Sequence, residues 1–261
     1  MGSFAPLLEF RWRRIDNQPV RRLRRPLLAA VLSLAVLAAD SSGARDADSA
    51  TARTPHVVIA KKGLVSYGAD SSYAEYGLVL RNRSTTRDAL NVTVKVRGLD
   101  SRGRAFTSTD DYITVIPAGT SFVVTGALIW NVSLNVARIA TVVHVGRAVP
   151  RGRRLPPVKN VHLAQQGRDI VGSLTNPYRR PLPSSAIVYG VFLDGNGRIV
   201  ATDNLTTEAV VRPGATVAFD LSGNFATTEQ LDAVRSMKVS VDPCGDVVLG
   251  AACPIAGARG L

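Results

Sequence analysis

The chain holds few of the residues on which enzyme and metal sites depend. Its 261 residues include only three histidines and two cysteines. His56, His144 and His162 never come at the close spacing of a compact metal site, and no HExxH motif occurs. A GxSxG nucleophile elbow and a glycine-rich phosphate loop are missing as well. The sequence therefore predicts a protein without metal, cofactor or catalytic motif, although a Ser-His-Asp site assembled only in the fold stays open as an alternative.

Aromatic residues are scarce too. They make up 6% of the chain, and none lies within the basic run Arg151–Arg154. Binding of single-stranded nucleic acid depends on aromatic side chains that stack on bases beside a basic groove. We therefore expect no nucleic-acid partner.

The apolar run Leu27–Ala39 falls short of the roughly 20 residues that span a bilayer comfortably. It follows the arginine-rich block 21–25, an order typical of a secretory signal. We expect residues 1–39 to be a signal peptide or an uncleaved signal anchor, and in the second case the protein would contact the membrane through residues 27–39. Residues 40–55 are small and polar, which predicts a flexible linker. The folded part is then expected to be extracytoplasmic, either secreted or membrane-anchored.

What the sequence has instead is a series of short apolar runs separated by turn residues. In segment 186–219, apolar residues alternate over Ile187–Leu193, which is typical of a strand with one buried face. The turns Asp194–Gly197 and Arg212–Gly214 separate this strand from the next two. One stretch differs from the strands: residues 227–237 predict one or two helical turns. Strands of this length with such turns predict an all-β fold built from β-sandwiches.

The same order of strands and turns occurs twice, which predicts a tandem repeat. Asn82 corresponds to Asn176 at an offset of 94 residues, as does Asp100 to Asp194. Pro117 matches Pro213 at an offset of 96, which implies a two-residue insertion between these landmarks. We expect a first β-sandwich over residues 56–146, a basic proline-containing linker over 147–159, and a second sandwich with a C-terminal tail over 160–261.

Three stretches of the second repeat carry a family resemblance: Gly172–Asn176 (GSLTN), Val191–Gly197 (VFLDGNG) and Arg212–Phe219. With these residues the repeat resembles the FxLYD domain, a small immunoglobulin-like β-sandwich of exported bacterial and archaeal proteins. In the first repeat the match is reduced to Arg97–Asp100. The resemblance implies an immunoglobulin-like fold and an extracytoplasmic setting. It brings no catalytic residues.

Cys244 and Cys253 are the only cysteines. An exported protein with two cysteines is expected to pair them, and this bridge would hold the tail that follows the last strand. A CxxC spacing is missing, so a redox role is not expected.

The chain carries a formal net charge of +12, which favours anionic partners. Arg151, Arg153, Arg154 and Lys159 of the linker are the candidate contact residues, and a solvated basic surface without a ligand is the alternative. We expect a non-enzymatic, exported or surface-exposed interaction module that binds a protein or an anionic cell-envelope polymer. A membrane-tethered accessory or spacer protein, and a hydrolase, are the two alternatives.

Overall fold

The computed structural model describes residues 56–66, 71–131, 135–164, 169–223 and 227–245. The predicted signal segment 1–39, the linker 40–55 and Cys253 lie outside the described residues. The described part belongs to one compact unit. Its elements are β1 (Val57–Ser66), β2 (Tyr73–Asn82), β3 (Arg87–Leu99), β4 (Ala105–Ile116), β5 (Ser121–Ile129), β6 (Arg138–Pro150), β7 (Val158–Ala164), β8 (Asp169–Thr175), β9 (Ile187–Asp194), β10 (Ile199–Thr206), β11 (Thr216–Ser222), α1 (Thr228–Asp232) and β12 (Val234–Asp242).

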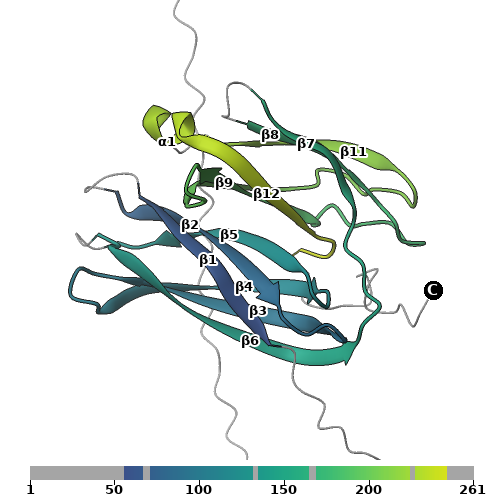
Figure 1. Ribbon diagram of the computed structural model, residues 1–261, viewed down its shortest axis with the longest axis horizontal. Helices are drawn as coiled ribbons and strands as arrows, with labels where there is room; N and C mark the ends of the chain where they lie inside the picture. Colours follow the sequence, from purple (N-terminus) through teal and green to yellow (C-terminus); the bar gives the residue numbers. More distant parts are fainter. Residues whose placement is uncertain (1–55, 67–70, 132–134, 165–168, 224–226, 246–261) are drawn as a thin grey trace, which may run out of the picture. The chain divides into compact units, whose positions relative to one another are not determined.

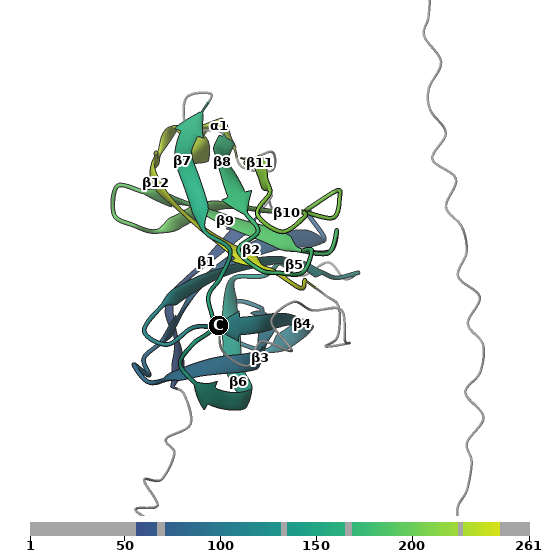
Figure 2. The same cartoon turned by 90° about the vertical axis from the view of Figure 1, so that its right-hand side faces the viewer.

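The strands form four antiparallel three-stranded sheets. Their orders are β1-β2-β5, β4-β3-β6, β11-β8-β7 and β10-β9-β12. Figures 1 and 2 show the sheets in layers, with the β10-β9-β12 sheet between the β1-β2-β5 and β11-β8-β7 sheets. The predicted all-β, immunoglobulin-like sandwich fold is confirmed.

Both halves of the chain have the same topology. In each, the first, second and fifth strands make one sheet, and the third, fourth and sixth make the other. Asn82 and Asn176 also make matching hydrogen bonds. The side-chain amide of Asn82 donates to the carbonyls of Arg87 and Ile116, and that of Asn176 donates to the carbonyls of Arg180 and Val211. Because an amide that donates to two backbone carbonyls fixes a loop, this residue sets the same loop in both sandwiches.

The Asp turns match as well. The Asp100 carboxylate accepts from the backbone N–H groups of Arg102 and Arg104, and Asp194 accepts from those of Asn196 and Arg198. The fourth residue of each turn is a glycine at positive φ, 82° at Gly103 and 71° at Gly197. These turns need an Asx acceptor and a residue that tolerates positive φ, which is why both repeats keep Asp-x-x-Gly.

The pairing of Pro117 with Pro213 needs a correction. The Thr120 N–H donates to the Pro117 carbonyl, and in the second sandwich the Ala215 N–H donates to the Arg212 carbonyl. Arg212 therefore takes the place of Pro117, an offset of 95 residues, and Pro213 is one position further along. The insertion between the repeats at this turn is one residue.

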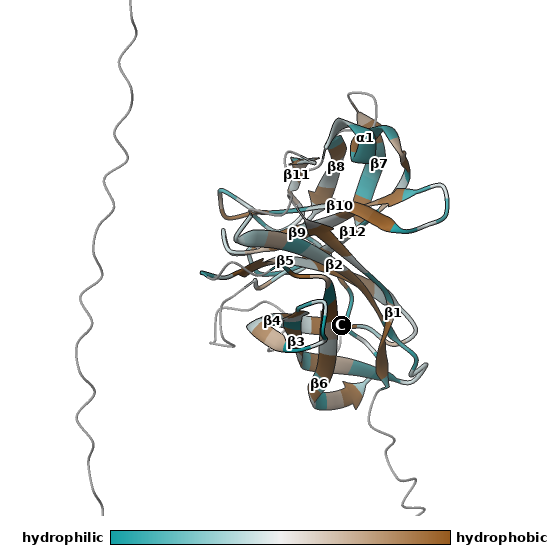
Figure 3. Ribbon diagram, turned by 90° about the vertical axis from the view of Figure 1, so that its left-hand side faces the viewer, coloured by the Kyte–Doolittle hydropathy of each residue, from teal (hydrophilic) through white to brown (hydrophobic). Residues whose placement is uncertain are grey.

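Strands β2 and β9 are buried on both faces. The prediction of one buried face for Ile187–Leu193 was wrong, because Ile187, Tyr189, Val191 and Leu193 pack with residues of the first sandwich in one core cluster. The alternate residues of β9, such as Val188 and Phe192, belong to the core of the second sandwich. Figure 3, coloured by hydropathy, shows the apolar residues along these inner strands.

The helical prediction for residues 227–237 is confirmed for its first turn. Thr227 caps α1, with a reciprocal capping box between Thr227 and Gln230. The closing strand β12 begins at Val234, within the stretch expected to be helical, because Val234 pairs with Asp194 of β9.

Candidate functional site: a basic surface at the Asn-loop end

The connection between the sandwiches is held by a buried carboxylate. Strand β6 extends to Pro150 and β7 begins at Val158, so seven residues join them. Asp88, which is fully buried, accepts hydrogen bonds from the backbone N–H groups of Ala118 (2.8 Å), Gly152 (2.9 Å) and Arg153 (2.7 Å). The Arg151 N–H donates to the Thr86 carbonyl at 2.8 Å. A carboxylate with three backbone donors holds the connection against the first Asn loop.

The second Asn loop meets the same connection from the other side. Its residue Tyr178 donates its phenol O–H to the Arg154 carbonyl. Tyr178 and Leu155 also pack beside the small buried cluster of Val115 and Cys244. Burial and the nearby Asp242 carboxylate raise the pKa of Tyr178, so the phenol stays a protonated donor.

The backbones of three segments that are distant in sequence thus meet at one end of the strands, and each carries arginines. We call this surface the basic end and define it by six residues: Arg87, Arg151, Arg153, Arg154, Arg179 and Arg180. Arg151, Arg154, Arg179 and Arg180 are exposed, whereas Arg87 and Arg153 are half-buried. Figure 2 views this side of the molecule, where the connection runs from β6 to β7.

None of these arginines has a carboxylate partner among the described residues. The ion pairs there are Lys95–Asp110 and Arg104–Asp100, and both lie on other parts of the first sandwich. The Nε atom of Arg153 is shielded from solvent and has no hydrogen-bond acceptor within the described part of the chain. A buried guanidinium N–H without an acceptor is costly, and an anion that reached it would supply the missing bond.

The structure brings together three of the four predicted contact residues. Arg151, Arg153 and Arg154 lie in the connection. Lys159 lies on β7, where it pairs with Ser173 of β8, and no hydrogen bond joins it to the other three. Sequence reasoning missed Arg87, Arg179 and Arg180. These three arginines closely follow Asn82 and Asn176, and the repeat of the two Asn loops is the sequence signal that could have indicated them.

Cys244 is fully buried at the end of β12. Its N–H donates to the carboxylate of Asp242, which also accepts from the Thr114 N–H of the first sandwich at 2.7 Å. Burial raises the pKa of Asp242, against the opposing effect of these donors. Cys253 lies outside the described residues, so its bridge to Cys244 stays a prediction.

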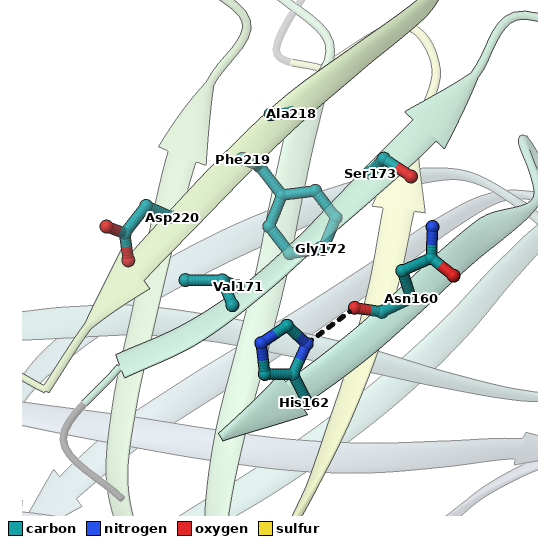
Figure 4. A pocket seen from close by; sticks show the side chains of 8 residues that line it. All are labelled: Asn160, His162, Val171, Gly172, Ser173, Ala218, Phe219 and Asp220. Carbon is teal, nitrogen blue, oxygen red and sulfur yellow. Dashed lines mark hydrogen bonds between the residues drawn. The ribbon is translucent and has the colours of Figure 1, made fainter. Parts of the chain in front are cut away.

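The histidines do not assemble a catalytic triad with their neighbours in the described part of the chain. His162 lines a shallow hollow of about 500 Å³ on the outer face of the β11-β8-β7 sheet, together with Ser173 and Asp220. Its Nδ1 lies 2.9 Å from the Asn160 carbonyl. Figure 4 shows Val171 between His162 and Asp220, and Ser173 further along the strand. Neighbours across two strands lie about 10 Å apart, so this arrangement cannot relay a proton.

His144 is exposed on β6, where it pairs with Thr93 of β3. Within the described ranges, no group of three metal-ligating side chains comes together. The turn at Asp194 uses its carboxylate to accept backbone N–H groups, as a hairpin turn does. Among the described residues, no helix is long and apolar enough to cross a membrane.

Comparisons with known proteins identify neither a family nor a curated relative: no protein-family model matches the chain, and no curated protein matches it. Among solved structures, it is similar to red sea bream transglutaminase, with 11% identity and a TM-score of 0.24. That match covers 71% of this chain and 29% of the transglutaminase. The chain thus spans less than a third of that protein, and so loose a likeness carries no argument about fold or chemistry.

Proposed function

We propose that this protein is a non-catalytic, exported interaction module that binds an anionic polymer of the cell envelope through the basic end. The observation that carries the proposal is the meeting of three arginine-bearing segments without a carboxylate partner among the described residues. Arginine offers a planar pair of donors that fits phosphate and carboxylate groups. A repeating anionic chain would meet several such pairs at once.

The backbone under the arginines supports the same proposal. Asp88 and Tyr178 hold the connection from both sides, so the guanidinium groups emerge from a fixed base. Binding to a preorganised surface loses less conformational entropy than binding to a free linker. The FxLYD resemblance and the predicted signal segment support a location outside the cytoplasm, where such polymers occur. A protein with an acidic surface is the alternative partner.

The test is a binding measurement with a defined polymer. We would titrate polyglycerol phosphate into the protein by calorimetry, with neutral dextran as the uncharged control. We expect binding of the phosphate polymer that weakens as salt rises, because exposed charges are screened within about 10 Å at 0.1 M salt. If the protein does not bind polyglycerol phosphate or polyglutamate, the envelope-polymer proposal fails.

A matched pair of variants locates the site. The first replaces Arg151, Arg154, Arg179 and Arg180 with Gln. The control replaces four exposed arginines at or near the opposite, Asp-turn end with Gln: Arg97, Arg102, Arg138 and Arg198. Both change the net charge equally. We expect the first variant to lose roughly tenfold or more in affinity, since each charge-assisted bond is worth about 1.5–3 kcal/mol, and the control to lose much less. Equal losses would mean that only net charge matters.

Membrane tethering is separable by fractionation. Intact mass of the native protein in medium and membrane fractions would show whether residues 1–39 are removed. Retention of residues 27–39 in the membrane fraction would make the protein a tethered version of the same module.

A further inference from the structure

A pair of glycines lies at the centre of the contact between the two sandwiches. Gly63 of β1 is directly opposite Gly77 of β2. A Cβ atom on Gly63 would lie 2.6 Å from the Cβ of Ile199, and one on Gly77 would lie 2.8 Å from Cγ2 of Thr202 and 2.9 Å from Cγ1 of Val191. Carbon atoms in proteins do not pack this closely. The two sheets can therefore approach to their present separation only if both residues are glycine.

Apolar and polar contacts surround this glycine pair. Val79 and Val123, a cross-strand pair next to it, are both buried. Within the buried contact, the Thr202 hydroxyl donates to the Glu75 carboxylate at 2.7 Å. At the exposed edge, the Lys61 ammonium donates to the Gly197 carbonyl at 2.7 Å. An apolar centre with a hydrogen-bonded rim is the usual anatomy of a specific interface.

The same face of the second sandwich has a different composition. Strands β7 and β8 correspond to β1 and β2, and their matching cross-strand pair is His162 and Val171. Ser173 and Ala218 replace the pair Val79 and Val123. Two side chains therefore occupy the space that the first sandwich leaves open.

We infer that the outer face of the β1-β2-β5 sheet is a docking surface selective for a sheet with branched aliphatic side chains at its centre. Its occupant is the β10-β9-β12 face of the same chain, which presents Val191, Ile199 and Thr202. The glycine pair makes the two sandwiches one cooperative unit. His162 and Val171 fill the corresponding face of the second sandwich, so that face is closed to a sheet of this kind.

The experiment is a steric suppression test in the full chain. Gly77→Ala introduces the clash, and Gly152→Ala is the control because nothing lies within 4 Å of a Cβ at that position. We expect Gly77→Ala to lower the unfolding midpoint by about 5–10 °C, the range for a small overpacked group in a domain of this size. Gly152→Ala should leave the midpoint nearly unchanged.

Two substitutions in the second sandwich should suppress the effect of Gly77→Ala. Val191→Ala and Thr202→Ser remove the two methyl groups that Gly77→Ala would strike, and serine keeps the hydroxyl that donates to Glu75. In this double-variant background, Gly77→Ala should no longer lower the midpoint. If Gly77→Ala costs the same number of degrees in both backgrounds, the effect is local to β2 and the inference is overturned.

Limited trypsin digestion gives a second readout. The connection contains Arg151, Arg153 and Arg154, which are tryptic sites. We expect Gly77→Ala to be cleaved there several-fold faster than the parent protein, because separation of the sandwiches exposes the connection, and the suppressed variant to return to the parent rate. Unchanged cleavage in Gly77→Ala would contradict the docking role.

Discussion

The two sandwiches share their topology and their turn residues. They differ in which member of each cross-strand pair is large and which is small. In the first core, Leu78 lies opposite Val124, and at the same place in the second core Gly172 lies opposite Phe219. A Cβ on Gly172 would lie 2.6 Å from Cζ of Phe219. The larger residue of the second pair fills the space that its glycine partner leaves, so the layer is filled in both sandwiches.

A second inward pair shows the same exchange. Tyr76 lies opposite Gly126 in the first sandwich, and Ile170 lies opposite Leu221 in the second. A side chain at position 126 would strike the Tyr76 hydroxyl, which donates to the carboxylate of Asp111. Volume changes on one strand are again compensated on its neighbour.

The cross-strand pair on the outer face of the sheet does not follow this pattern. Gly63 and Gly77 are both small, and His162 and Val171 are both large. The volume missing from the first pair is supplied by Ile199 and its neighbours in the other sandwich, not by the neighbouring strand. Inward pairs thus diverge while each sandwich keeps its own packing, and the outward pair has diverged with the choice of partner.

The largest expected effect comes from exchanging the outward pairs. The variant Gly63→His/Gly77→Val gives the first sandwich the pair of the second, and it should lose about 3–6 kcal/mol of unfolding free energy, since overpacking costs roughly 1–3 kcal/mol per site. The reverse variant His162→Gly/Val171→Gly creates no clash and should lose only about 1–2 kcal/mol from glycine in strands. Urea unfolding measures both.

Circular dichroism at zero urea shows whether each exchange variant folds. If Gly63→His/Gly77→Val does not fold, the single substitution Gly77→Val takes its place against Val171→Gly. Equal losses of unfolding free energy in the first-sandwich and second-sandwich variants would contradict the inference that only the first sandwich has another sheet packed on this face.

A smaller and symmetric effect is expected at the Asn loops. Asn82→Ala and Asn176→Ala each leave one buried and one partly buried carbonyl without their donor, and each should cost about 2–3 kcal/mol. Asn196→Ala, at an exposed turn position, should change stability by less than about 0.5 kcal/mol. A large loss at one loop and a small loss at the other would show that the matching hydrogen bonds are not equivalent in energy.

The sequence predicted the all-β fold because the signals for it are local. Alternation marks single strands, and the Asn and Asp positions satisfy backbone groups within a few residues of themselves. The packing of one sandwich on the other was missed. The positions that alternate with the predicted buried face of Ile187–Leu193, among them Val188 and Phe192, are apolar too, which is compatible with burial on both faces. The sequence does not show which element covers the second face.

The candidate site was predictable only in part, for the same reason. Arg151, Arg153 and Arg154 form a visible run in the sequence. Arg179 and Arg180 join them through the bond from Tyr178 to the Arg154 carbonyl, a contact between residues 24 positions apart. Asp88 holds the connection from a distance of 64 positions and carries no motif that would single it out. Contacts of this kind depend on tertiary structure, and a local pattern does not encode them.

The smallest expected effect is a pH dependence at Asp203 of β10. Burial raises the pKa of Asp203 to about 6, and the nearby carboxylates of Glu75 and Asp220 add to the shift. Because the folded state binds this proton more tightly than the unfolded chain, the group favours folding at low pH. That contribution is lost as the pH rises from about 4, the usual pKa of an aspartate, to about 6.

Asp203→Asn should therefore match the parent protein at pH 4 and exceed its stability at pH 7 by about 1 kcal/mol, a figure reduced for partial exposure to solvent. Asn keeps the oxygen that accepts from the Asn204 N–H. Asp242 titrates with the same sign in both proteins, so it cancels in their difference. Asp232→Asn on α1 is the exposed control. A difference between Asp203→Asn and the parent that stays constant from pH 4 to pH 7 would mean that the carboxylate is not destabilised by its burial.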